Sequence, residues 1–181
     1  MAANHIDFLF VTETFFSSTI PDSLCTNETF ACLRSDRSDS HPKKRGGGTA
    51  VFYKKSIDLS PVQISPTDYL KHFCEVLVCD HRPSKTRIIL VYRPPSTSAS
   101  QTLELFKSLT ALLDISDYHF VILGDFNFPA IHWLPDLLPD SPEFLVDWMT
   151  SFHLSQLVTF PTRTSRLGKK KIPRSTFLLQ H

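Results

Sequence analysis

Short apolar runs separated by polar or proline-containing segments dominate the chain, and this pattern predicts strands more often than helices. The first run, Ile6–Val11, is rich in β-forming residues and passes directly into Thr12, Glu13 and Thr14. A connection with room for one helical turn is expected over residues 17–29. The further strands that we expect are Phe30–Arg34, Thr49–Lys55, Phe73–Cys79, Arg87–Tyr92 and His119–Leu123.

Two segments instead place apolar residues on one face of a helix. In Thr102–Ile115, Thr102 is the expected N-cap, and the expected buried face consists of Leu103, Phe106, Leu109, Leu112 and Leu113. In the second segment, Ser141 is the expected cap of a helix that runs to about Phe152, with Phe144, Leu145, Trp148 and Phe152 inward. The expected fold class is therefore α/β or α+β with more than one layer.

The composition fits one globular domain, because the chain has 181 residues, of which 41% are hydrophobic and 20% charged. The net charge of +1 favours no class of partner, but the charges are unevenly distributed. No acidic residue follows Phe160, whereas the same segment contains Arg163, Arg166, Lys169, Lys170, Lys171 and Arg174. This tail could contact phosphates or be a solvated chain end, and both interpretations stay open.

Cysteine and histidine spacing does not indicate a zinc site. The four cysteines, Cys25, Cys32, Cys74 and Cys79, form no C-x-x-C pair, and the eight histidines show no ligand spacing. Buried free thiols in a reducing compartment are the expectation. We expect no signal peptide, and the first apolar run is too short to cross a bilayer. An intracellular protein is therefore expected, with a nuclear location left open.

Two polar positions at strand ends could have a chemical role. Gly124 would allow a tight exit from a buried strand, and Asp125 and Asn127 would then point the same way. An acid beside an amide suits an anionic substrate, although both residues are also ordinary in turns. Glu13 follows another buried strand, and its carboxylate is either solvated or a ligand of a hard cation such as Mg²⁺.

The order of the motifs is more specific than any one of them. The chain reads F-V-T-E-T-F, then R-S-D-R, G-G-G-T-A-V-F-Y, I-L-V-Y-R-P-P, V-I-L-G-D-F-N-F-P-A-I-H-W and Q-L-V-T-F-P-T-R. From about Ile6 to Arg163, it resembles the endonuclease domains of non-LTR retrotransposons, within the exonuclease–endonuclease–phosphatase superfamily. The resemblance implies a four-layer α/β sandwich, with two mostly antiparallel sheets flanked by helices.

The resemblance also implies Mg²⁺-dependent cleavage of phosphodiester bonds in DNA. Glu13 matches the family's metal-binding glutamate, and Tyr92 matches a tyrosine that faces the scissile phosphate. Asp125 matches the acid that orients or deprotonates the attacking water, and Asn127 matches the amide that holds the phosphate. This chemistry is coherent, because hydrolysis needs a polarised phosphoryl oxygen, an aligned water and stabilisation of charge on phosphorus.

The chain departs from the family pattern near both ends. No asparagine-bearing strand precedes the Glu13 strand, and residues 175–179 look like the start of an aspartate-bearing strand without its aspartate or the later Ser-Asp-His. We therefore expect missing terminal strands, little or no nuclease activity, an incomplete domain over 1–163 and a basic divergent tail over 164–181. Two alternatives stay open: a non-catalytic nucleic-acid-binding remnant and a phosphatase of the same superfamily.

Overall fold

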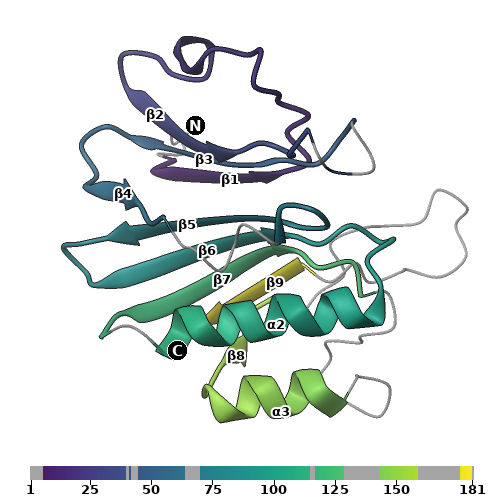
Figure 1. Ribbon diagram of the computed structural model, residues 1–181. Helices are drawn as coiled ribbons and strands as arrows, with labels where there is room; N and C mark the ends of the chain where they lie inside the picture. The colour runs from purple at the N-terminus through teal and green to yellow at the C-terminus, as the bar shows by residue number, and fades with distance from the viewer. Residues whose placement is uncertain are drawn as a thin grey trace, which may run out of the picture.

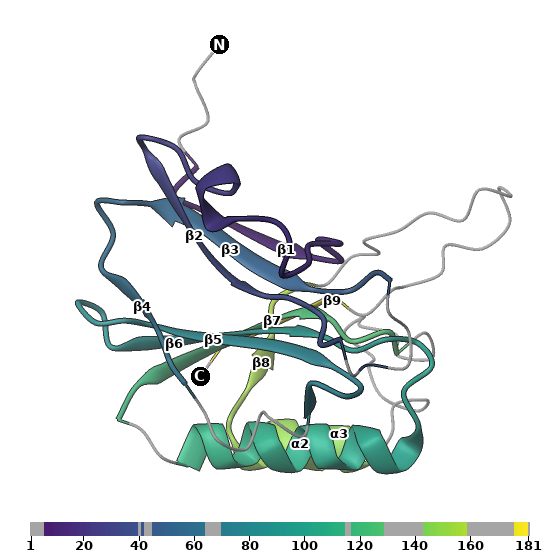
Figure 2. The same cartoon turned by 45° about the horizontal axis from the view of Figure 1, so that its top comes forward.

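The computed structural model describes residues 6–39, 41, 45–63, 70–114, 117–128 and 143–158, and the backbone of 176–180. Two β-sheets lie face to face, and two helices cover the outer face of the larger sheet (Figures 1 and 2). The expected α/β sandwich of two mostly antiparallel sheets is confirmed. The predicted boundary at residue 163 and the basic residues between 163 and 174 lie outside the described residues.

The smaller sheet has three antiparallel strands in the order β1-β3-β2. Its strands are β1 (Phe8–Thr12), β2 (Phe30–Ser35) and β3 (Thr49–Lys54). A short 3-10 helix, η1 (Asp22–Leu24), lies in the connection between β1 and β2, where the sequence left room for one helical turn. All three strands were predicted, with bounds that differ from the observed ones by one or two residues.

Among the residues that the structure describes, the larger sheet has six strands in the order β4-β5-β6-β7-β9-β8. Its strands are β4 (Leu59–Pro61), β5 (Glu75–His81), β6 (Thr86–Tyr92), β7 (His119–Asp125), β8 (Ser155–Gln156) and β9 (Thr176–Gln180). Neighbouring strands pair antiparallel except for β6 and β7, which are parallel. The helix between these two strands provides the crossover that a parallel pair requires. The strand expected to begin near residue 175 is present as β9.

Successive side chains along each strand of the large sheet point to opposite faces, and they belong to two apolar clusters. Leu77, Ile88 and Leu90 face the smaller sheet, where they pack with Val51. On the opposite face, Ile89 and its neighbours pack against helices α2 (Ala99–Asp114) and α3 (Glu143–Ser151). The large sheet is therefore buried on both faces, which explains the nearly continuous apolar run in β6.

Helix α2 begins earlier than predicted, and Thr102 is not its cap. Ser98 has that role, because its hydroxyl accepts from the Gln101 N–H at 3.2 Å while the Gln101 side chain accepts from the Ser98 N–H at 2.9 Å. This reciprocal pair is a capping box. Leu103, predicted to be buried, is 49% exposed, and Leu105 is buried instead. The other four predicted residues, Phe106, Leu109, Leu112 and Leu113, are buried as expected.

Helix α3 confirms the second predicted helix in part. Leu145 and Trp148 are buried as expected, and Phe152 is half-buried just beyond the helix. Phe144 is 39% exposed, so its inward placement was wrong, although its ring still meets Phe106 edge-to-face. The predicted cap Ser141 lies outside the described residues.

The four cysteines are free thiols, three of them buried and Cys32 half-buried. Burial raises the pKa of Cys74 and Cys79 to about 12, so these thiols stay protonated. Within the described ranges, no helix is long and apolar enough to cross a membrane.

The parallel pairing of β6 and β7 depends on a glycine. Gly124 lies opposite Val91 at φ 139°, and a Cβ built there would overlap the Val91 carbonyl oxygen. Gly46 also has a positive φ, but a Cβ there would meet the Phe15 ring at 3.5 Å, an ordinary contact. A substitution at Gly46 would therefore add backbone strain alone, whereas a substitution at Gly124 would add both strain and steric overlap.

We expect Gly124→Ala to lower the free energy of unfolding by about 3 kcal/mol or more, because overlap with backbone adds to the left-handed strain. Gly46→Ala, the matched control, should cost only about 1 kcal/mol. Urea denaturation followed by circular dichroism measures both. Equal losses in the two variants would contradict the steric argument.

Candidate active site

Three polar side chains lie in one row across neighbouring strands of the large sheet. Tyr92 at the end of β6 is in register with Glu75 on β5 and with Asp125 on β7. Alternation along each strand places all three on the face toward the smaller sheet, in line with Leu77, Leu90 and Leu123 of the inter-sheet cluster. The sequence therefore brings Tyr92 and Asp125 together through strand pairing alone.

Glu13 approaches this row from the end of β1 in the smaller sheet. The Tyr92 hydroxyl donates a hydrogen bond of 2.6 Å to Glu13 Oε1. Burial and then the bond to Glu13 raise the pKa of Tyr92 well above its usual value, so the phenol stays neutral and remains a donor. The charges of Glu13 and Asp125 also raise the pKa of Tyr92.

The turn after β7 holds Asp125 and Asn127 close together. The Asn127 backbone N–H donates to Asp125 Oδ1 at 3.0 Å, and Asn127 has a left-handed φ of 49°. Asparagine tolerates this conformation better than most residues. Its side-chain amide donates to the Arg93 carbonyl at 2.8 Å, which occupies one of the two amide hydrogens. Among the described residues the second hydrogen has no partner, so it can donate to a ligand.

Arg37 and Glu75 form a buried ion pair beside Tyr92. Arg37 Nε lies 2.5 Å from Glu75 Oε1, and the two side chains are 6% and 2% exposed. The guanidinium carbon is 6.0 Å from the centre of the Tyr92 ring. A Cβ at Gly47 would overlap this guanidinium, so the glycines before β3 give the arginine its space. Burial raises the pKa of Glu75, and Arg37 opposes the rise.

Arg93 stabilises the turn that follows β7 through hydrogen bonds. Its guanidinium donates to the carbonyls of Phe126 and Asn127 at 3.0 and 3.3 Å, to the Thr97 carbonyl at 3.2 Å and to the Thr102 hydroxyl at 3.0 Å. It also lies over the Phe128 ring at 4.4 Å. Burial lowers the pKa of Arg93. In the described part of the chain, the hydrogen-bond partners of Arg93 are uncharged. The buried cation is therefore stabilised by hydrogen bonds to neutral acceptors, not by an ion pair.

The proposed metal ligand is compatible with Mg²⁺. Glu13 is exposed, and its carboxylate supplies the hard oxygen atoms that this ion prefers. Mg²⁺ often uses one or two carboxylates together with water and substrate phosphate. Among the described side chains, no three His, Cys, Asp or Glu residues gather to hold a metal ion.

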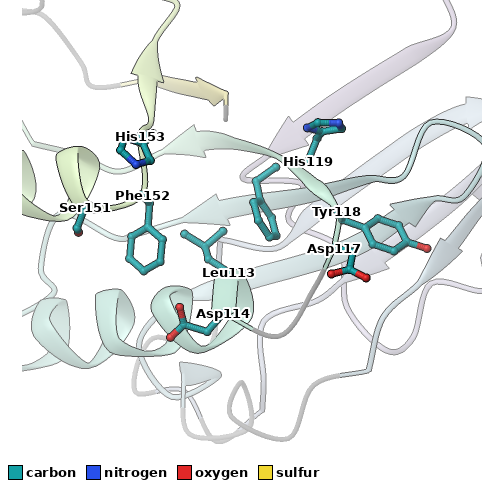
Figure 3. A pocket seen from close by; sticks show the side chains of 9 residues that line it. Leu113, Asp114, Asp117, Tyr118, His119, Ser151, Phe152 and His153 are labelled. Atoms are coloured by element: carbon teal, nitrogen blue, oxygen red, sulfur yellow. The ribbon is translucent and has the colours of Figure 1, made fainter.

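A cavity of about 400 Å³ lies elsewhere, at the opposite end of β7 (Figure 3). Leu113, Phe120 and Phe152 supply apolar lining, and Asp114 and Asp117 supply carboxylates. Asp125 lies at the other end of the strand, about 20 Å away at about 3.3 Å per residue. This cavity is therefore separate from the polar row.

The fold is a two-sheet α/β sandwich, and its candidate site lies at one end of the sandwich. The family model of the Endonuclease/Exonuclease/phosphatase family matches residues 1–172, and the chain belongs to that family. No curated protein sequence matches the chain.

Solved structures support the same architecture. A 3' phosphatase from Neisseria bound to product DNA hairpin has a TM-score of 0.68 at 19% identity, with 99% of this chain and 77% of that one covered. An AP endonuclease from Archaeoglobus fulgidus has a TM-score of 0.61 at 15% identity, with 96% and 76% covered. The endonuclease domain of TRAS1, a telomere-specific non-LTR retrotransposon, has a TM-score of 0.56 at 12% identity, with 96% and 72% covered. At these identities the likeness establishes the fold.

All four residues singled out from the sequence therefore lie at one end of the sandwich, while their catalytic roles stay predictions. Sequence reasoning missed Arg37, Glu75 and Arg93. Arg37 belongs to the R-S-D-R motif and Arg93 to Y-R-P-P, so both had a signal in the motif order. Glu75 also had a signal in the sequence, because an acid at the start of an otherwise apolar strand needs a partner when it is buried.

We expect Arg93→Met to lower the free energy of unfolding by about 2–4 kcal/mol, because several buried acceptors lose their donor. Arg82→Met, at an exposed turn position, should change it by less than about 0.5 kcal/mol. Urea denaturation compares the two variants. A decrease in the free energy of unfolding below about 1 kcal/mol for Arg93→Met would mean that the turn keeps its conformation without the hydrogen bonds from Arg93.

Proposed function

We propose that this chain is a Mg²⁺-dependent endonuclease domain that hydrolyses phosphodiester bonds in DNA. The observation that carries the proposal is the hydrogen bond from Tyr92 to Glu13, which joins the polar end of one sheet to the other. It places the proposed metal ligand next to the row that contains Asp125. Members of this family are generally dependent on divalent metals.

The residues would divide the work as follows. Glu13 would hold Mg²⁺, and the bound ion would supply polarisation of a phosphoryl oxygen. Asp125 would orient the attacking water and accept its proton as the new P–O bond forms, while the ester P–O bond breaks and the leaving oxygen takes a proton from solvent water. Asn127 would donate its remaining amide hydrogen to a phosphate oxygen. Tyr92, kept neutral, has one hydroxyl hydrogen, which it would turn from Glu13 toward the same charge when a phosphate binds.

The finer assignment is to the retrotransposon type of endonuclease. The motifs that contain Tyr92-Arg93-Pro94-Pro95 and Ile131-His132-Trp133 support it, together with the order of the remaining motifs. The basic residues 163–174 would add backbone contacts to DNA, and binding through them would weaken as salt concentration rises.

A phosphatase is the second candidate, because the Neisseria structure is a 3' phosphatase bound to a DNA hairpin. The same row could act on a terminal phosphate, since hydrolysis at phosphorus needs the same charge stabilisation. A DNA hairpin with a 3'-phosphate tests this directly beside an intact supercoiled plasmid.

We expect the purified chain to nick supercoiled plasmid slowly in Mg²⁺ and not in EDTA. The rate should be low because Glu13 is the single carboxylate assigned to the metal. Asp125→Asn should reduce the rate by about 10²–10⁴-fold, the usual contribution of a general base. Asp114→Asn, an exposed acid beside the distant cavity, should leave the rate unchanged.

Gel electrophoresis of the plasmid measures nicking, and phosphate release from the hairpin measures the second reaction. Phosphate release without nicking would replace the endonuclease proposal with the phosphatase. DNA binding without either reaction would favour the non-catalytic binding protein. Equal nicking by Asp125→Asn and the unchanged chain would mean that the row is not the active site.

A further inference from the structure

An exposed aromatic side chain stands next to the proposed metal ligand. Phe15 follows Glu13 by two residues and is 66% exposed. Both residues have a left-handed φ of 58°. That conformation costs non-glycine residues roughly 1–2 kcal/mol each. The chain thus holds a large apolar ring in solvent on strained backbone, at the edge of the candidate active site. Such strain concentrates where a ligand is bound.

Specific contacts hold this segment in place. The Phe15 N–H donates to the Gly47 carbonyl at 2.9 Å, and the Thr14 N–H donates to the Gly48 carbonyl at 3.3 Å. Phe15 Cε1 would lie 3.5 Å from a Cβ built on Gly46, so the ring rests against the glycine backbone. Its position is therefore set by the same glycines that make room for Arg37.

The neighbouring charge favours a nucleic acid as the ligand of this ring. Arg45 directly precedes the glycines and is exposed, and its backbone carbonyl accepts a bond from Arg37 at 3.0 Å. An exposed cation beside an exposed aromatic ring suits a strand that presents both phosphates and flat bases. A partner without phosphates would leave the cation unused.

We propose that Phe15 is a nucleic-acid contact whose ring packs on a base or sugar of the DNA strand cleaved at Asp125. This proposal rests on the proposed function and adds a binding subsite to it. Every base has a π-face, so the contact would tolerate any sequence. Arg45 would contact a phosphate of the same strand and contribute to the salt dependence of binding.

The test is binding of the full chain to a fluorescein-labelled DNA hairpin of mixed sequence, measured by anisotropy in EDTA so that no cleavage occurs. We expect Phe15→Ala to weaken binding by roughly 5- to 150-fold, the usual range for loss of one stacked base. Phe15→Trp should restore it. Leu24→Ala, which removes another exposed apolar side chain from the connection between β1 and β2, should bind like the unchanged chain.

Salt dependence separates stacking from charge. Phe15→Ala should lower affinity at every salt concentration and keep the same slope of log K against log salt, because no ionic contact is lost. Arg45→Ala should reduce that slope by about one. Urea denaturation of each variant controls for folding, and Phe15→Ala should unfold at the same midpoint as Leu24→Ala.

The outcomes that overturn the proposal differ from those that overturn the function. If Asp125→Asn stops nicking while Phe15→Ala binds DNA normally, the enzyme assignment stands and the subsite is wrong. If the unchanged chain does not bind the hairpin, both are wrong. Equal weakening by Leu24→Ala, or failure of Phe15→Trp to restore binding, would also exclude a stacking contact. A stacking contact would also be excluded if Phe15→Ala lost self-association in a sedimentation experiment but still bound DNA normally.

Discussion

The parallel pairing of β6 with β7 is the constraint on which the candidate site depends. This register places Tyr92 beside Asp125 and, through β5, beside Glu75. A slip of one residue would turn a side chain such as Tyr92 from the inter-sheet face to the face covered by the helices. Gly124 secures the register because the Val91 carbonyl occupies the space that any Cβ would need. The glycine of the Gly-Asp-Phe-Asn motif thus has a steric reason that does not involve chemistry.

Two arginines stabilise the surroundings of the row by different physical means. Arg37 compensates the buried charge of Glu75. Arg93 instead donates hydrogen bonds to the neutral carbonyls of Phe126 and Asn127 in the turn after β7. Losing either arginine would leave buried polar groups without partners, which costs more than the bonds contribute on balance. Glu13 differs from Glu75 because it is exposed at the end of its strand. The burial of one acid and the exposure of the other separate a structural carboxylate from one that can bind a cation.

Most strand positions could be predicted from the sequence because buried strands appear as short apolar runs with polar ends, and Glu13, Asp125 and Asn127 follow such runs. Tyr92 was assigned only through the resemblance of the motif order. The boundary of α2 could not, since Ser98 and Thr102 are both plausible caps and only the reciprocal bond with Gln101 decides between them. Arg37 and Glu75 are 38 residues apart, and a pair at that separation follows from sheet packing rather than local pattern. Likewise, nothing local distinguishes Leu103 from Leu105 until the helix is docked.

The two sheets contribute different parts of the site, and polar bonds link them at this end. Tyr92 of the larger sheet bonds to Glu13 of the smaller one, while Arg37, just beyond β2, bonds back to Glu75 on β5. A phosphate held between Glu13 and Asp125 would therefore bridge the sheets. Its affinity would depend on the apolar cluster around Val51 and Leu90, which sets their separation. Packing far from this site would thus control the geometry of the proposed catalysis, because a small shift between the sheets would move the proposed metal ligand Glu13 relative to the proposed base Asp125.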